Sequence, residues 1–362
     1  MHVFYPQVQP LQPAAMVDQG ARPSAAFVAR IRAAYRHALE LSRGPGESTW
    51  TMISGLNQSI HELLLGEGEE LIDLLAAPGK TKLFFGFDSI FDDILKRLQD
   101  PDAPVVLESQ RINVASGIVR LAEALAVRSV VNPEGGGTTY QPDWHQGIDL
   151  DVLLTAIGER LEIALDFPNP FAGEFGVQTQ AGVASERAIQ AIYQATRLRE
   201  LSPRAAGGLL EIGAGLGRTA YYATQLGLTD YTVVDLPLTN VAQALYLGHV
   251  LGEDAVSLQG EPAKAGQVRI RSPEWLHAGD ERFGLVLNAD SLTEMDRAYA
   301  EEYARFIRAR CSLFLSLNHE VNPFRVRDLA AFADYHVTRH PYWMRAGYVD
   351  ELYERPQGAK PG

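Results

Sequence analysis

The sequence predicts an α/β protein, with a doubly wound parallel sheet in its second half and a mainly helical region before it. Two observations lead to this fold class. Up to about residue 180, apolar residues recur at the spacing of helix turns. Beyond that point, short apolar runs of strand length alternate with helical segments, which is typical of parallel strands joined by helices.

The first half of the chain is predicted to contain a lead-in and a helical domain. Residues 1–25 are rich in proline and predict a poorly ordered lead-in. Residues 26–180 are predicted to form the mainly helical domain, because helical spacing occurs over 27–39, 60–75 and 112–125. The glycine-rich segment NPEGGGTTYQPDWHQG, residues 132–147, predicts a loop on the substrate side.

The second domain is predicted to span residues 181–355. The segment 166–176 contains two prolines and several aromatic residues, so it cannot continue a helix and marks the passage between the halves. After it, helices are predicted over 186–201, 219–226 and 241–251, and strands over 209–212, 231–234, 268–270, 283–287 and 313–317. This alternation predicts the doubly wound sheet.

Composition excludes several classes of function. The chain has 32 Lys and Arg against 45 Asp and Glu, a formal net charge of -13, which disfavours nucleic acid and anionic membranes as partners. Cys311 is the only cysteine, so we expect no internal disulfide, and we interpret it as a small buried apolar residue. No secretion signal and no apolar run of membrane-spanning length is recognisable, which predicts a soluble, cytoplasmic protein.

A glycine turn after the first strand of the second half suggests a cofactor site. Gly213, Gly215 and Gly217 follow the run 209–212 with the spacing G-x-G-x-G, whereas the usual dinucleotide fingerprint is G-x-G-x-x-G. Arg218 occupies the position of that third glycine. A tight turn without a ligand and an NAD site therefore remain alternatives, but the spacing favours a different nucleoside cofactor.

Two acidic residues at strand ends complete the pattern. Glu211 ends the first strand, and Asp235, followed by Leu236, ends the next one in YTVVDLP. Together with the glycines they predict binding of S-adenosylmethionine. Asp235 would accept hydrogen bonds from both ribose hydroxyls, and the glycine turn would pass beneath the amino-acid portion.

Six segments resemble the sugar O-methyltransferases of bacterial polysaccharide and natural-product pathways. They are LFFGFDSI (83–90), LLEIGAGLGRTAYYATQLG (209–227), YTVVDLP (231–237), LNADSLTEM (287–295), LSLNHE (315–320) and WMRAGYVDELY (343–353). The resemblance implies a Class I methyltransferase fold with its Rossmann-like sheet, S-adenosylmethionine as cofactor, and a small-molecule acceptor methylated on a hydroxyl of a sugar or a glycosylated natural product. Methyltransferases of this shape often dimerise through the N-terminal helical region, so a homodimer is one expectation.

The residues that would perform methyl transfer are expected beyond the carboxyl ends of the fourth and fifth strands. These are the segments 288–294 and 318–320. We predict that His319 is the general base that takes the acceptor's proton, because a neutral imidazole titrates near working pH. Asn288 and Asp290 would close the adenosine side of the cofactor, with Asp290 a second catalytic candidate. A histidine that only hydrogen-bonds a neighbour is the alternative interpretation of His319.

A magnesium-assisted mechanism is a second hypothesis. Asp290, Glu294, Asn318 and Glu320 could offer oxygen ligands that lower the pKa of the acceptor hydroxyl. Related metal-dependent enzymes carry an Asp-Asn pair after the fifth strand, whereas this chain has Asn318 and His319, so magnesium is not favoured. Asp290 and Glu294 could instead cap the following helix.

The candidate substrate contacts are less specific. His145 lies with Tyr140 and Trp144 in the glycine-rich loop, where they could form a wall against a sugar. Glu320 and Trp343 are further candidates, although a large aromatic such as Trp343 also serves core packing. Two other functional classes remain open at this point: a non-catalytic protein that senses the cofactor, and an NAD-dependent oxidoreductase.

Overall fold

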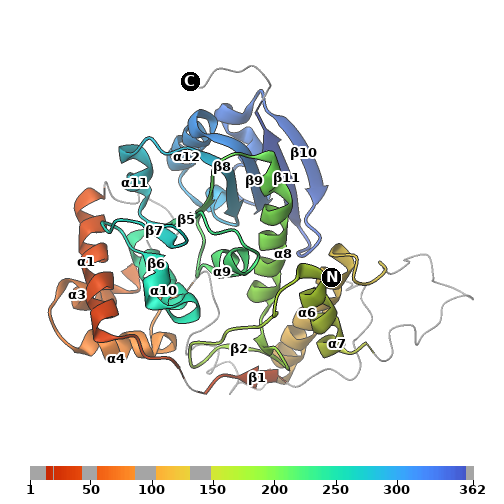
Figure 1. Ribbon diagram of the computed structural model, residues 1–362, viewed down its shortest axis with the longest axis horizontal. Helices are drawn as coiled ribbons and strands as arrows, with labels where there is room; N and C mark the ends of the chain where they lie inside the picture. Colours follow the sequence, from red (N-terminus) through yellow and green to blue (C-terminus); the bar gives the residue numbers. More distant parts are fainter. Residues whose placement is uncertain (1–13, 19, 43–54, 86–102, 131–147, 356–362) are drawn as a thin grey trace, which may run out of the picture.

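The computed structural model describes residues 14–18, 20–42, 55–85, 103–130 and 148–355. Its central element is an eight-stranded sheet with the strand order β10-β11-β9-β8-β4-β5-β7-β6 (Figure 1). The strands are β4 (Gly208–Ile212), β5 (Tyr231–Val234), β6 (Val256–Ser257), β7 (Val268–Arg271), β8 (Phe283–Ala289), β9 (Cys311–His319), β10 (His336–Pro341) and β11 (Tyr348–Glu354). Among the described residues, no helix is both long and apolar enough to span a bilayer.

Six strands run parallel, and a C-terminal hairpin completes the sheet. β4 pairs with β5 on one side and with β8 on the other. The strands β5 to β7 therefore lie on one side of β4, and the strands from β8 onward lie on its other side. β11 lies antiparallel to β9, and β10 pairs antiparallel with β11. This strand order and these directions confirm the predicted Class I methyltransferase fold.

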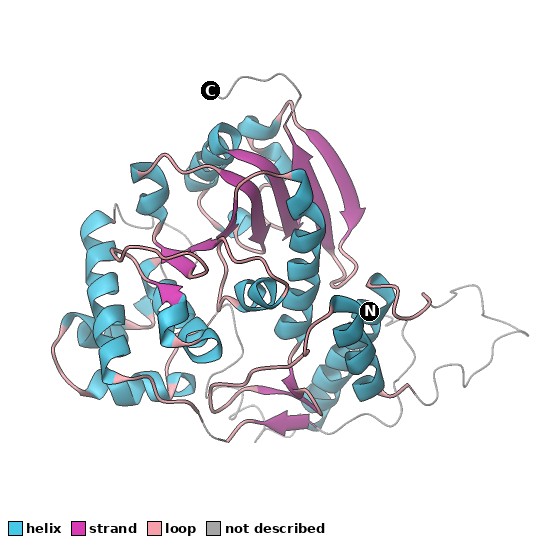
Figure 2. Ribbon diagram, viewed as in Figure 1, coloured by secondary structure: helices cyan, strands magenta, loops and turns pink. Residues whose placement is uncertain are grey.

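Helices cover both faces of the sheet, because the strands carry apolar side chains on both faces. Leu209 and Leu285 pack toward one face, whereas Leu210 and Val286 pack into a separate cluster on the other, because successive side chains of a strand point in opposite directions. The first face is covered by α8 (Glu186–Leu201), α9 (Arg218–Gln225) and α10 (Pro237–Leu251), and the second by α11 (Pro273–Ala278) and α12 (Arg297–Arg310). Figure 2 shows the strands between these helices.

The N-terminal region is mainly helical and contains a small second sheet. Its helices are α1 (Ala25–Leu41), α3 (Gln58–Leu65), α4 (Glu70–Ala76), α6 (Ala103–Ala124) and α7 (Leu150–Leu161). The helical pattern expected over 60–75 is divided into α3 and α4, with Gly66 as the C-cap of α3. A three-stranded antiparallel sheet joins β1 (Ala14–Met16), β2 (Phe175–Thr179) and β3 (Gly182–Ala184). Residues 14–16, inside the segment expected to be poorly ordered, thus pair with a strand.

The two halves share one apolar core. α1, α3 and α4 gather beside the β6 edge of the large sheet in Figure 1, and α1 packs on α10. Gly248 permits this close contact, because a Cβ at that position would lie 2.4 Å from Cε1 of Phe27. The helical region therefore approaches the carboxyl edge of the large sheet as a fixed part of the molecule.

Candidate active site

A cavity of about 450 Å³ opens at the carboxyl edge of the parallel strands. Its walls come from the turns after β4, β5 and β8, from α8, and from α1 and α3 of the N-terminal region. The position agrees with the rule that ligands of open α/β sheets bind where the strand order reverses. The sheet therefore brings together residues that are more than one hundred positions apart in the sequence.

The glycine turn after β4 forms part of the cavity wall. Gly213 has φ +74° and Gly215 has φ +55°, in the left-handed region that side chains disfavour. A Cβ on Gly213 would lie 2.0 Å from Oγ of Ser291. Gly217 serves a different purpose, since it is the N-cap of α9 with φ +90° and lies against Leu247. Gly213 and Gly215 line the cavity, whereas Gly217 shapes the helix start.

Asp235 presents a fixed carboxylate to the cavity. Its Oδ1 accepts the backbone N–H of Leu236 at 2.9 Å, and its Oδ2 accepts Nε2 of Gln243 at 3.0 Å. Burial raises the pKa of Asp235 to about 7, and these hydrogen bonds oppose the rise. Asp235 and Leu236 both line the cavity, as the sequence predicts for the nucleoside end of a cofactor.

Glu211 also lines the cavity, and it is more buried than Asp235. Its Oε2 accepts the hydroxyl of Tyr231 at 2.8 Å. Burial raises the pKa of Glu211 to about 8, and the charge of Asp235 adds to this rise. Near pH 7 Glu211 is therefore mostly protonated, and it can donate as well as accept hydrogen bonds.

Asn288 and Asn318 brace the strand ends instead of facing the cavity. Nδ2 of Asn288 donates to the carbonyl of Ile212 at 2.9 Å, and Nδ2 of Asn318 donates to Oδ1 of Asn288 at 2.9 Å. Both residues are fully or almost fully buried. Neither residue lines the cavity, and their buried amide network holds β4, β8 and β9 in register. The contact of Asn288 with a cofactor stays a prediction.

Asp290 lines the cavity from the end of β8, which flanks β4 on the side opposite to β5 and Asp235. It adopts φ +56°, which is uncommon for a residue with a side chain. The hydroxyl of Tyr348 lies 3.0 Å from both carboxylate oxygens, and Nη1 of Arg345 donates to Oδ2 at 3.0 Å. All three residues line the cavity. These donors hold one carboxylate at a defined position at the end of β8.

His319 lies next to Asp290 but is not among the residues that line the cavity. Its Nε2 is 3.5 Å from Oδ1 of Asp290, and its Nδ1 accepts the backbone N–H of Val321 at 3.3 Å. The ring also packs edge-on against Tyr348, with centroids 5.2 Å apart. With Nδ1 engaged as an acceptor, Nε2 carries the proton and points it at Asp290. Of these two residues, Asp290 lines the cavity and His319 lies in contact with it, so the role of His319 as a base stays a prediction.

The expected magnesium ligands do not assemble. Asn318 is buried against Asn288, and Glu320 forms ion pairs with Arg339 at 2.7 Å and Arg327 at 3.2 Å. A different trio, Asp290, Glu294 and His319, has ligand atoms within 4.8 Å of one another.

The guanidinium of Arg345 makes this trio a poor cation site. It already lies 3.0 Å from Oδ2 of Asp290, and Arg187 approaches the same oxygen at 3.8 Å. Like charges repel at such distances, so the surroundings of Asp290 disfavour a divalent cation. Of the expected ligands, Asp290 and Glu294 lie together whereas Asn318 and Glu320 are engaged elsewhere, so this geometry does not support the magnesium hypothesis.

Of the three candidate substrate contacts, Trp343 and Glu320 are described by the structure, and neither lines the cavity. Trp343 is 40% exposed and donates from Nε1 to the carbonyl of Arg120 at 3.2 Å, in a separate depression beside α6 and α8. Glu320 is held by arginines away from the cavity. His145, with Tyr140 and Trp144, lies outside the described residues.

The cavity also contains residues that sequence reasoning missed. Tyr35 of α1 and His61 of α3 line it, and the Tyr35 hydroxyl lies 2.7 Å from Nδ1 of His61. Burial raises the pKa of Tyr35 to about 12, so its hydroxyl remains protonated. Gln190 and Gln194 contribute from α8. Only the helical spacing of Tyr35 was visible in the sequence, and it indicated packing.

Comparisons with known proteins give similarities of fold at low sequence identity. No family model and no curated protein matches the chain. Among solved structures, the glycopeptide N-methyltransferase MtfA complexed with sinefungin is 17% identical, with a TM-score of 0.34 over 45% of this chain and 87% of that one. Magnesium protoporphyrin IX methyltransferase (ChlM) from Synechocystis PCC 6803 is 10% identical, with a TM-score of 0.36 over 47% and 80%. The CcbJ methyltransferase from Streptomyces caelestis is 13% identical, with a TM-score of 0.36 over 46% and 89%.

Proposed function

We propose that the protein is an S-adenosylmethionine-dependent O-methyltransferase that acts on a hydroxyl of a sugar or a glycosylated natural product. The observation that carries this proposal is the arrangement of two carboxylates in one cavity. Asp235 follows β5 beside the glycine turn, and Asp290 follows β8 on the other side of β4, where Arg345 and Tyr348 donate hydrogen bonds to it. The space between them suits a nucleoside cofactor and a small acceptor.

The cofactor end is supported by the residues around Asp235. Its carboxylate would accept hydrogen bonds from the two ribose hydroxyls, with Leu236 against the base. Gly213 and Gly215 would admit the amino-acid portion close to the backbone, and the protonated carboxyl of Glu211 would contribute a donor nearby. When bound, the cofactor supplies an electrophilic methyl group on a sulfonium.

We assign the proton transfer to Asp290. The cofactor would supply the methyl group to the acceptor oxygen, with its sulfur as the leaving atom, and the Asp290 carboxylate would take the hydroxyl proton. Tyr348 and Arg345 orient that carboxylate through hydrogen bonds, and Nε2 of His319 lies 3.5 Å from its Oδ1. His319 acts in this mechanism as an orienting residue.

A sugar acceptor is supported by the character of the wall around Asp290. Tyr299, Tyr342 and Tyr348 line the cavity and offer ring faces with hydroxyl groups. Rings of this kind pack against the apolar face of a sugar while their hydroxyls bond its edge.

The test begins with binding and continues with turnover. Calorimetric titration with S-adenosylhomocysteine and, separately, NADH, each with and without Mg²⁺, identifies the cofactor. We expect micromolar binding of S-adenosylhomocysteine that is independent of Mg²⁺, followed by transfer of a labelled methyl group to members of a glycoside panel. Binding of NADH alone would refute the proposal, and cofactor binding without any accepted substrate would favour a sensing protein.

A further inference from the structure

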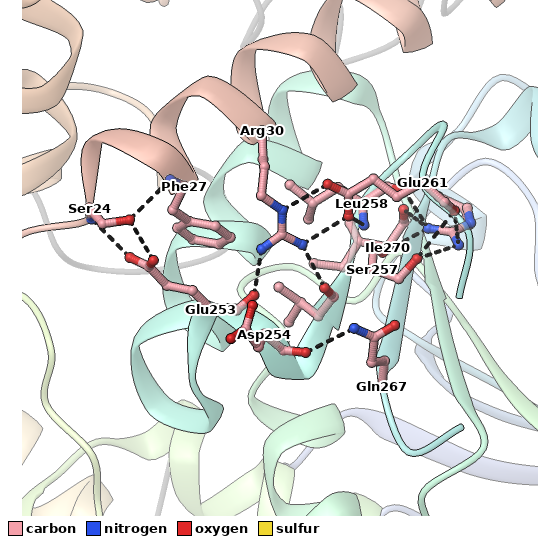
Figure 3. Close-up of polar contacts among 12 residues, drawn as sticks. Ser24, Phe27, Arg30, Glu253, Asp254, Ser257, Leu258, Glu261, Gln267 and Ile270 are labelled. Atoms are coloured by element: carbon pink, nitrogen blue, oxygen red, sulfur yellow. Dashed lines mark hydrogen bonds and ion pairs between the residues drawn. The ribbon is translucent and has the colours of Figure 1, made fainter. Parts of the chain in front are cut away.

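A polar network outside the cavity fastens α1 to the edge of the large sheet (Figure 3). Nε and Nη2 of Arg30 donate to the two carboxylate oxygens of Glu261 at 2.8 and 2.9 Å. The same guanidinium donates to the carbonyls of Glu253 at 2.7 Å and Val256 at 2.9 Å. Arg30 thus makes four hydrogen bonds to a segment more than 220 positions away in the sequence.

This contact is more specific than an ordinary surface ion pair. Arg30 and Glu261 are only 29% and 28% exposed, and the pairing is bidentate. The hydrogen bond from Arg30 lowers the pKa of Glu261, so the pair stays charged over the physiological range. A bidentate guanidinium that also binds two carbonyls fixes both the position and the rotation of the helix that carries it.

Glu261 also organises the neighbouring part of the sheet. Its Oε2 accepts the backbone N–H of Leu258 at 2.8 Å. The adjacent Gln259 accepts the backbone N–H of Ser272 at 3.1 Å, and Ser272 directly precedes Pro273, which lines the cavity. Glu261, which binds Arg30 of α1, therefore lies two residues from Gln259, which bonds the residue directly before the cavity-lining Pro273.

The same helix carries Tyr35 into the cavity. Tyr35 is five residues after Arg30 and bonds to His61 of α3, and Pro237 and Leu236 line the same cavity. Neither Arg30 nor Glu261 lines that cavity. Any shift of α1 along the sheet edge would move Tyr35 and His61 relative to Asp235.

We propose that the Arg30–Glu261 pair is a positioning device that sets the affinity of the nucleoside cofactor by holding Tyr35 and His61 in place as a wall of its cavity. The inference rests on the proposed function for the identity of the ligand. It adds that the N-terminal helix is part of the cofactor site, and that a contact outside the cavity controls it.

The experiment measures the Kd for S-adenosylhomocysteine and the melting temperature of the full chain. We expect Arg30→Met and the milder Glu261→Gln to raise the Kd about tenfold, within the range of coupled contacts. The matched control is Arg269→Met, which removes another Arg–carboxylate pair at 2.7 Å, between Arg269, 27% exposed, and Asp230, 62% exposed; neither residue lines the cavity. It should lower the melting temperature and leave the Kd unchanged.

A double variant separates positioning from general destabilisation. If Arg30 acts through Tyr35, then Arg30→Met should cost no further affinity in a Tyr35→Leu background. Equal losses in both backgrounds, or a Kd within twofold of the wild type for both single variants, would overturn the inference while the proposed function stands. Absence of binding by the wild type would refute the proposed function and the inference together.

Discussion

Replacing Asp235 by Asn tests the cofactor site most directly. The substitution preserves the shape of the side chain but exchanges one accepting oxygen for an amide donor. In the protein, Oδ1 accepts the backbone N–H of Leu236 and Oδ2 accepts Nε2 of Gln243, so the new amide NH₂ must face one of these two donors. The variant therefore creates a donor opposite a donor at one of these two places.

The expected loss follows from the strength of hydrogen bonds to a charged acceptor. Each contributes about 1.5–3 kcal/mol. Losing the charge and one ribose contact should cost about 3 kcal/mol, which weakens the binding of S-adenosylhomocysteine roughly 100-fold. Calorimetry at pH 8, where Asp235 is ionised, measures this. Asp230→Asn at the opposite end of β5 is the matched control, and a Kd for Asp235→Asn within twofold of the wild type would refute the ribose assignment.

The pH dependence gives an independent check on the same residue. Without ligand, burial raises the pKa of Asp235 to about 7, whereas the ribose hydroxyls require the ionised form. Below pH 7 binding must release a proton, so affinity falls as the pH is lowered. We expect binding at pH 6 to be about tenfold weaker than at pH 8 in the wild type. In Asp235→Asn the dependence should disappear.

Three further predictions address the rest of the site. Asp290→Asn should lower turnover by about 10²-fold and retain cofactor affinity, and His319→Ala should lower turnover by a smaller factor. If His319→Ala instead loses more labelled methyl transfer than Asp290→Asn, the histidine is the base. Gly213→Ala, with φ +74° and a Cβ 2.0 Å from Ser291 Oγ, should destabilise the fold by about 2–3 kcal/mol in denaturant titrations, and an unchanged midpoint would contradict the strain. Burial raises the pKa of Glu211 from its ordinary value of 4.5 to about 8, so its protonated form stabilises the fold below pH 4.5 and this contribution is lost as the pH rises through 8. The melting temperature of the ligand-free wild type should fall from pH 5 to pH 8.5, more steeply than that of Glu211→Gln; parallel curves would exclude a raised pKa.

Local pattern was sufficient for most of the parallel strands of the second half and for α8, α9 and α10. The predicted run 231–234 coincides with β5, and the predicted helix 186–201 coincides with α8. Strands buried on both faces are continuous apolar runs, which makes them visible without any tertiary information. The hairpin β10–β11 was not predicted, because its strands mix charged and apolar residues, and β6 is only two residues long.

The candidate site, like the fold, was only partly predictable from the sequence. Glycines and a strand-end acid indicate a nucleoside site from the sequence alone, because backbone conformation and strand ends are local properties. Which of Asp290 and His319 faces the acceptor depends on side-chain direction at two adjacent strand ends. Tyr348, which bonds Asp290, comes from a strand 58 positions later, and the sequence carries no signal for that contact.

The sequence by itself therefore determined the class of fold and the glycine turn and strand-end acid that line the cavity, since both depend on short segments whose physical constraints are local. Only the tertiary structure decided that Asp290 lies in front of His319, that Asn288 and Asn318 brace strands, and that Tyr35 belongs to the cavity. These outcomes depend on packing between elements far apart in the chain, and such packing is set by the whole core and not by any one segment.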